Sequence, residues 1–312
     1  MSNAKNFFWE VKDLTKPTRL DVFCASKNPS LTRSQIKTTL VSVKVNGTEA
    51  KLSKKIFNGD MVDLKVKPSV PESIELFPSP LKIVYEDKNI IVVEKPSGMV
   101  SHPAAGHYTK TLVNALEFYR RELSDFADEF SKASLEFNDK SLRRGIVHRL
   151  DKDTSGLILT ARNKKAESFY IESFKKRKIE KYYIAILNKP LQKKSGLLMT
   201  SIFRSKHNRQ KFLASSDLTK GKLAVTRYKV LKELKNFSLV LFKIYTGRTH
   251  QIRVHSKFLN SGIVGDPIYN KDKKHTLMLH AIKLKFKTQE GNILNLKTKV
   301  PERFLDFWWG IK

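Results

Sequence analysis

From residue 81 onward the sequence consists mainly of short runs of apolar and β-branched residues. Four of these runs each predict a short strand: KIVYED, NIIVVEK, LILTA and KYYIAIL. Two further runs, LAVTRYKVLKEL and FSLVLFKIYTG, flank Lys235-Asn236 and predict a β-hairpin. Because strands outnumber helices and do not alternate with them, we expect a mostly antiparallel mixed sheet rather than repeated βαβ units.

Two stretches of the same region have helical spacing. Residues 164–177 place four side chains on one face: Ala166, Phe169, Tyr170 and Phe174. Residues 249–260 end before Gly262, a typical helix stop, and Thr249 is a candidate N-cap. Residues 120–143 are polar and charged, and we interpret them as a helical insertion. A few helices covering such a sheet make an α+β fold over residues 81–312.

Two further regions precede this one. Residues 17–67 contain RLDVF, PSLTRSQIKTTL, VSVKVNG and GDMVDLKV, a pattern of short helices and short strands with glycine turns. Thr32 is a candidate N-cap for a basic helix that carries Arg33, Gln35 and Lys37. Residues 68–80 hold four prolines and read as a linker.

Charge and cysteine content limit the class of protein. The 312 residues include 60 Lys and Arg against 30 Asp and Glu, a formal net charge of +30. Such a surplus attracts phosphate backbones, although a general bias toward lysine is an alternative explanation. Cys24 is the single cysteine, which excludes an intramolecular disulfide and a thiolate metal cluster. With no signal-peptide pattern and no apolar run near the ~18 residues of a membrane span, we expect a cytoplasmic protein away from membranes.

The segment GIVHRLDKDTSG, residues 145–156, places Asp151 between Arg149 and Lys152. Nearby cations favour the ionised carboxylate, which can act as a nucleophile or a base. We interpret Asp153 as a residue of the following turn. No second acid stands where a glycosidase pair would need it, at a separation of ~5 to 9.5 Å. One carboxylate must therefore carry any chemistry.

The segment TGRTHQIRVH, residues 246–255, supplies further candidates. Arg248 is placed in a loop, where it can contact RNA, and Arg253 on the helix that follows. His250 and His255 would be rotated by about 140° on a helix, so they would not share a metal ion. The sequence contains no glycine-rich phosphate loop or dinucleotide fingerprint, and we expect no metal or other cofactor.

Several ordered segments together resemble the RluA family of RNA pseudouridine synthases. They are VVEKPSGMVSHPA, GIVHRLDKDTSG, TGRTHQIRVH, GDPIY, LMLHA and TKVPERF, and they cover residues 81–312 almost continuously. Without the resemblance, KPSG would be only a structural turn. The N-terminal region, residues 17–67, similarly resembles an S4-type RNA-binding domain, in which Arg33, Gln35 and Lys37 would contact RNA. A small domain with no ligand is the alternative for that region.

The resemblance implies roles for individual residues. Asp151 would be the essential aspartate, and Arg253 the arginine that pairs with it. Tyr183 would pack against the target uracil, although a strand tyrosine is otherwise more often core and Tyr182 lies beside it. The remaining implied substrate contacts are Arg149, which fills the space of the flipped base, Leu279, which closes over the uracil, and His148. Arg144 stands where relatives commonly carry proline, which affects loop rigidity and adds a cation.

The implied activity is isomerisation of uridine to pseudouridine without a cofactor, on a base that has left its stack. The expected partner is RNA, most of all 23S rRNA or a pre-ribosomal particle, with tRNA as the alternative substrate, and we expect a monomer. A different class, a catalytically silent RNA-binding or ribosome-assembly factor, would also explain the charge. A hydrolase using His148 and Asp151 lacks a plausible nucleophile or metal set.

Overall fold

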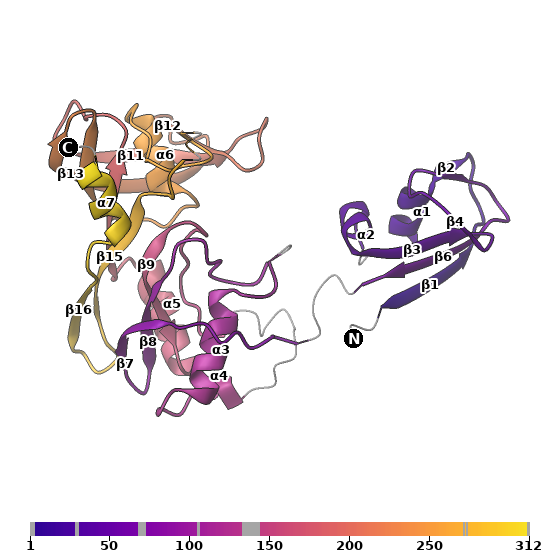
Figure 1. Cartoon of the computed structure of the whole chain (residues 1–312), viewed down its shortest axis with the longest axis horizontal. Helices are drawn as coiled ribbons and strands as arrows, with labels where there is room; N and C mark the ends of the chain where they lie inside the picture. Colours follow the sequence, from indigo (N-terminus) through magenta and orange to yellow (C-terminus); the bar gives the residue numbers. More distant parts are fainter. Residues whose placement is uncertain are drawn as a thin grey trace. The chain divides into compact units, whose positions relative to one another are not determined.

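The computed structural model describes residues 4–28, 31–67, 73–104, 107–132, 144–270, 272 and 274–310. The chain divides into two compact units between Ile74 and Glu75 (Figure 1). The boundary falls inside the predicted linker 68–80. Residues 68–72 of that linker lie outside the described residues, whereas Glu75 and Phe77 hydrogen-bond to Asn114 in the second unit.

The first unit is a small sheet with helices. Its strands run in the order β1-β6-β3-β4, and β2 pairs with β5. The elements are β1 (Lys5–Glu10), β2 (Thr18–Arg19), α1 (Leu20–Lys27), α2 (Arg33–Thr39), β3 (Leu40–Val45), β4 (Thr48–Glu49), β5 (Lys55–Ile56) and β6 (Met61–Val66). Strand β1 lies before residue 17, the predicted start of the domain. It nevertheless belongs to this unit, because Phe7 and Trp9 pack against the core of the unit.

The predicted N-cap of α2 is confirmed. The Thr32 hydroxyl accepts a hydrogen bond from the Gln35 N–H, and the Gln35 side chain accepts one from the Thr32 N–H. This reciprocal arrangement satisfies two donors that the first helical turn leaves open. Gln35 therefore has a local structural function in addition to any contact with RNA.

The second unit is built on one large sheet in the order β12-β11-β13-β14-β10-β15-β9-β8-β7, with β16 paired to β15. Its strands are β7 (Lys82–Glu86), β8 (Ile90–Lys95), β9 (Ser155–Ala161), β10 (Glu180–Leu187), β11 (Ser195–Arg204), β12 (Phe212–Ser215), β13 (Lys222–Leu234), β14 (Phe237–Ile244), β15 (Leu279–Lys287) and β16 (Ile293–Lys297). All pairs are antiparallel except β9 with β15. The predicted mostly antiparallel mixed sheet, with its 222–244 hairpin, is confirmed.

Helices cover both halves of this sheet (Figure 1). They are α3 (Leu112–Glu122), α4 (Glu129–Lys132), α5 (Lys164–Lys175), α6 (Gln251–Phe258) and α7 (Glu302–Gly310). Of the predicted insertion 120–143, residues 133–143 lie outside the described residues. No helix in the described part of the chain is long and apolar enough to span a membrane.

The prediction of Thr249 as the N-cap of α6 is wrong. The cap is His250, whose backbone is left-handed with φ 56°, and its side chain makes no capping bond. The loop is closed instead by the Gln251 side chain, whose oxygen accepts from the Arg248 N–H and the Thr246 hydroxyl.

The cation that Arg144 was expected to add to the loop is present but paired. Arg144 is buried, and its guanidinium donates to Glu117 at 3.0 Å. Glu117 also pairs with Arg120, which in turn pairs with Asp128. The Arg144 charge is therefore neutralised in a buried network that joins α3 to the start of the 145–151 segment.

The parallel pairing of β9 with β15 is very short, two residue pairs: Ser155 with His280 and Gly156 with Ala281. Gly156 has φ +114°, and a Cβ there would lie 2.3 Å from the Ala281 carbonyl oxygen. Only glycine allows this backbone conformation together with so close an approach. Gly156 thus fixes the distance between the Asp151 segment and the first residues of β15.

We expect Gly156→Ala to destabilise the protein by more than about 3 kcal/mol, since it adds a steric clash to an unfavourable backbone conformation. Gly291→Ala is the matched control, with φ +98° and only the flexible Lys287 side chain nearby, at 3.5 Å. The control should lose only the roughly 1–2 kcal/mol cost of the left-handed backbone. Denaturant unfolding measures both variants, and equal losses would contradict the clash.

Candidate active site

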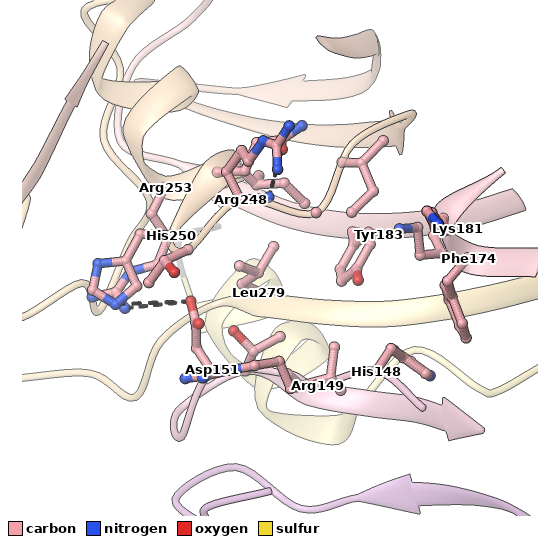
Figure 2. A pocket seen from close by; sticks show the side chains of 18 residues that line it. His148, Arg149, Asp151, Phe174, Lys181, Tyr183, Arg248, His250, Arg253 and Leu279 are labelled. Carbon is pink, nitrogen blue, oxygen red and sulfur yellow. Dashed lines mark hydrogen bonds and ion pairs between the residues drawn. The ribbon is translucent and has the colours of Figure 1, made fainter. Parts of the chain in front are cut away.

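A pocket of about 350 Å³ opens where β10, β15, the 148–154 segment and the loop before α6 meet (Figure 2). All seven residues assigned to catalysis or substrate binding in this unit line it: His148, Arg149, Asp151, Tyr183, Arg248, Arg253 and Leu279. Asp151 is the one carboxylate among the described residues that line this pocket. The structure therefore brings together segments separated by more than 100 residues.

The turn after β8 fixes the backbone on both sides of Asp151. The Ser101 hydroxyl donates to the Leu150 carbonyl at 2.8 Å and accepts from the Leu150 N–H. The buried Lys95 ammonium donates to the Lys152 carbonyl at 3.0 Å and to two carbonyls of its own turn. Burial lowers the pKa of Lys95 to about 7. The KPSG turn is thus structural, as its residues indicated, and it positions the segment that carries Asp151.

Arg253 links Asp151 to a second, buried carboxylate. Its guanidinium donates to both Asp266 oxygens, from Nε at 2.7 Å and from Nη2 at 2.8 Å. Its Nη1 lies 3.8 Å from Oδ2 of Asp151. Asp266 fixes the orientation of the guanidinium, because such a two-point contact allows little rotation. The predicted pairing of Arg253 with Asp151 is present, but Asp266 is the tighter partner.

His250 is a pocket residue that sequence reasoning considered only as a metal ligand. Its Nε2 lies 4.0 Å from Oδ2 of Asp151 (Figure 2), and its Nδ1 lies 2.9 Å from the Tyr269 hydroxyl. That hydroxyl accepts the Phe212 N–H and can donate to Nδ1, which leaves the ring proton on Nε2. Burial lowers the pKa of His250, and the Asp151 charge partly opposes this shift. A neutral imidazole with its N–H toward Asp151 follows.

Tyr183 and Leu279 form an apolar wall of the pocket. Both side chains are almost fully buried, Tyr183 on β10 and Leu279 at the start of β15. Burial, together with the charge of Asp151, raises the pKa of Tyr183, which keeps the phenol neutral. The pocket thus combines an apolar wall with the Asp151 carboxylate and the Arg253 guanidinium.

The other three predicted substrate contacts, His148, Arg248 and Arg149, differ in how many of their polar atoms already have hydrogen-bond partners within the protein. His148 lines the pocket, but its Nε2 accepts the Leu159 N–H at 2.9 Å, and burial lowers its pKa to about 3. It cannot serve as the base of a hydrolase with Asp151. Arg248 donates from Nε to the Leu223 carbonyl. Arg149 is exposed at the pocket.

His250 and His255 point to different surroundings, as predicted. His255 is buried between the hydroxyls of Thr200 and Thr226, at 2.9 Å from each. Within the described ranges, no group of three or more His, Cys, Asp or Glu side chains is placed to hold a metal ion.

Comparisons with known proteins agree with this geometry. The family model described as RNA pseudouridylate synthase matches residues 89–257. The "Ribosomal large subunit pseudouridine synthase D" of Borreliella burgdorferi is 39% identical, covering 93% of this chain and 88% of the relative. An uncharacterized RNA pseudouridine synthase of Bacillus subtilis is 36% identical, with 92% of each covered. Among solved structures, human RNA Pseudouridylate Synthase Domain Containing 4 has a TM-score of 0.57 at 26% identity, covering 72% of this chain and 90% of that one.

The chain therefore belongs to the RNA pseudouridylate synthase family and is an RNA pseudouridine synthase. Within that family it is of the RluA type and similar to the large-subunit synthases D.

We expect Asp266→Asn to lower the isomerisation rate and to destabilise the protein by roughly 3–5 kcal/mol, because it leaves a buried guanidinium without its main counter-charge. Asp272→Asn is the control, since Asp272 accepts from the Gly265 N–H in the same loop but is partly exposed. Thermal unfolding and the rate measured well below the unfolding temperature test both variants. Wild-type stability and rate in Asp266→Asn would contradict the role of Asp266.

Proposed function

We propose that this chain isomerises specific uridines of the large-subunit 23S rRNA to pseudouridine in the cytoplasm, acting as a monomer on rRNA or a pre-ribosomal particle. The relatives named as large-subunit synthases support this substrate over tRNA and over a silent RNA-binding role. The net charge of +30 supports binding to a long polyanion.

Asp151 starts the reaction in this proposal, either by attacking C1′ or by removing the C2′ proton. The observation that carries it is the contact of Asp151 Oδ2 with Arg253 at 3.8 Å in a pocket that contains no second acid among its described residues. The guanidinium keeps the carboxylate charged and aimed. Tyr183 and Leu279 enclose the flipped uracil, and Arg149 stacks where the base had been.

His250 acts through Asp151. Its Nε2 lies 4.0 Å from Oδ2 of Asp151, the same oxygen that Nη1 of Arg253 approaches at 3.8 Å. Two donors near one oxygen favour a single orientation of the carboxylate and leave Oδ1 for the substrate. His148 and Arg248 contribute walls of the pocket and support it through their backbone partners.

We expect Asp151→Asn to reduce conversion by roughly 10⁴-fold or more, the scale of losing a catalytic nucleophile, with little change in RNA affinity. Asp153→Asn, two residues further in the same segment, is the matched control and should stay active. Unmodified 23S rRNA from a strain lacking the gene is the substrate, with total tRNA in parallel. Release of the C5 hydrogen of uridine and mapping of pseudouridine give the rate and the position.

Recovery of pseudouridine with Asp151→Asn would end the assignment of Asp151. Conversion of tRNA in preference to rRNA would overturn the proposed substrate while leaving the chemistry intact.

We also propose that the first unit is an S4-type domain that binds RNA through its basic helix. Arg19 and Arg33 both donate hydrogen bonds to the Asp21 carboxylate. These bonds lower the pKa of Asp21 to about 2, and the bond from Arg19 has the larger effect. Asp21 thereby orients two exposed guanidiniums beside Lys37 along one hollow of the surface. Three cations on one side of the unit suit successive phosphates.

Substitutions at Lys37 and Gln35 test RNA binding and stability of this unit separately. We expect Lys37→Gln to weaken RNA binding and to reduce the slope of log affinity against log salt by about 1, with unchanged stability. Gln35→Ala should instead cost about 1 kcal/mol of stability through the lost cap, with the salt slope retained. Filter binding over a salt series and thermal unfolding distinguish them. An unchanged salt slope in Lys37→Gln would count against the RNA-binding helix.

A further inference from the structure

Lys181 is a pocket residue to which neither the sequence motifs nor the comparisons assign a role. It lies on β10, two residues before Tyr183, and its side chain lines the same pocket (Figure 2). The ammonium lies over the Phe174 ring, 5.4 Å from its centroid. It is also 3.7 Å from the position that a Cβ on Gly247 would take.

The surroundings of Lys181 satisfy its charge poorly. Among the described residues no carboxylate forms an ion pair with it, and burial alone lowers its pKa to about 8. By contrast, the fully buried Lys95 donates to three carbonyl oxygens. A partly desolvated ammonium facing an aromatic ring, and open to the pocket, is poised for an acceptor that arrives with the substrate.

The position of Lys181 favours a group on the base over a phosphate. The exposed cations at the rim of the pocket are Arg149 and Lys175, and Lys175 can meet a hydrated phosphate. Lys181 lies instead beside Phe174 and Tyr183, on the side of the pocket away from Asp151 (Figure 2). A uracil against Tyr183, with its sugar at Asp151, would direct its far edge toward Lys181.

We propose that Lys181 Nζ donates a hydrogen bond to a carbonyl oxygen of the target uracil and stabilises the negative charge that the base carries after its bond to the sugar has broken. The inference rests on the proposed function of Asp151. When the C1′–N1 bond breaks, its electron pair stays on the uracil and spreads over N1 and both carbonyl oxygens. A preorganised cation in a water-poor site stabilises such a charge strongly.

The chemistry balances without a co-reactant. Asp151 meets the electron-deficient sugar, by bonding to C1′ or by taking the C2′ proton, and this change is reversed when C5 bonds to C1′. The proton lost from C5 is matched by the proton that N1 takes up, so the product is an isomer of the substrate. Lys181 keeps its proton throughout and serves as a donor only.

The test uses the full-length protein and an rRNA fragment that the wild type converts. Lys181→Met keeps the length of the side chain and its apolar contact with Phe174, and we expect single-turnover conversion to fall roughly 10²-fold with RNA affinity within about twofold. Lys181→Arg should recover part of the rate, because it restores a donor. Lys178→Met, an exposed lysine outside the pocket, is the matched control and should behave as wild type.

A substitution in the RNA identifies the acceptor atom. Fragments carrying 2-thiouridine or 4-thiouridine at the target replace one carbonyl oxygen by sulfur, a weaker acceptor. At the contacted position the sulfur should slow the wild type but not slow Lys181→Met further, because the contact is already lost. Thermal unfolding of each variant confirms that the comparison is between folded proteins.

Two results would overturn the proposal. A Lys181→Met variant with weakened RNA binding, a reduced salt slope and an unchanged rate at saturation would place the ammonium at a phosphate. Fully additive effects of both thio substitutions would show that Lys181 touches neither carbonyl. Failure of the Asp151 assignment is seen separately, as activity in Asp151→Asn with Lys181 intact.

Discussion

The short parallel pairing of β9 with β15 is the contact on which the site depends. It joins two otherwise antiparallel halves of the sheet, β7-β8-β9 and the half from β15 to β12. The pairing is reinforced by a buried polar network, in which the Ser155 hydroxyl contacts both His280 Nδ1 and Arg303, and His280 Nε2 contacts Thr298. Burial lowers the pKa of His280 to about 3, so the ring stays neutral at its centre. Because Asp151 lies in the turn that leads into β9 and Leu279 begins β15, this contact fixes the carboxylate against the apolar wall.

The second constraint is electrostatic. In the proposed reaction, a lone carboxylate in a partly buried pocket needs a counter-charge, but a tight ion pair would occupy the oxygens that would meet the substrate. Arg253 resolves this conflict because Asp266 takes its Nε and Nη2 and leaves Nη1 at 3.8 Å from Asp151. Asp266 thereby neutralises the Arg253 guanidinium, which only orients Asp151. A direct bidentate pair between Arg253 and Asp151 would give a more stable but less reactive arrangement.

Six strands of the large sheet were predicted, β7, β8, β9, β10, β13 and β14, since alternation and apolar runs are local signals. Strands β11, β12, β15 and β16 were not predicted. Asp151, Tyr183, Arg253 and Leu279 lie far apart in the chain, so no local pattern could group them into one pocket. They were predicted from the resemblance of the ordered motifs to the RluA family. Other features depend on contacts that no local pattern contains. His250 reaches Asp151 through a left-handed backbone and a bond to Tyr269, and Arg144 is buried by Glu117 of α3. Helix α3 itself was not predicted, because its buried face includes polar residues such as Asn114 and Arg120 that are paired only in the folded state.

The distribution of charge along the pocket explains how Lys181 can line it without forming an ion pair with Asp151. Asp151, Arg253 and His250 lie at one end, Lys181 at the other, and Tyr183 and Leu279 lie between them (Figure 2). The field of Asp151 contributes to the raised pKa of Tyr183, whereas burial is the cause that lowers the pKa of Lys181. The apolar middle thus separates the Asp151 carboxylate from the Lys181 ammonium, so that the two do not form an ion pair across the pocket. A bound uracil would bridge that gap, placing its glycosidic carbon at the acid and its far edge at the ammonium, so that the charge released at one end is received at the other.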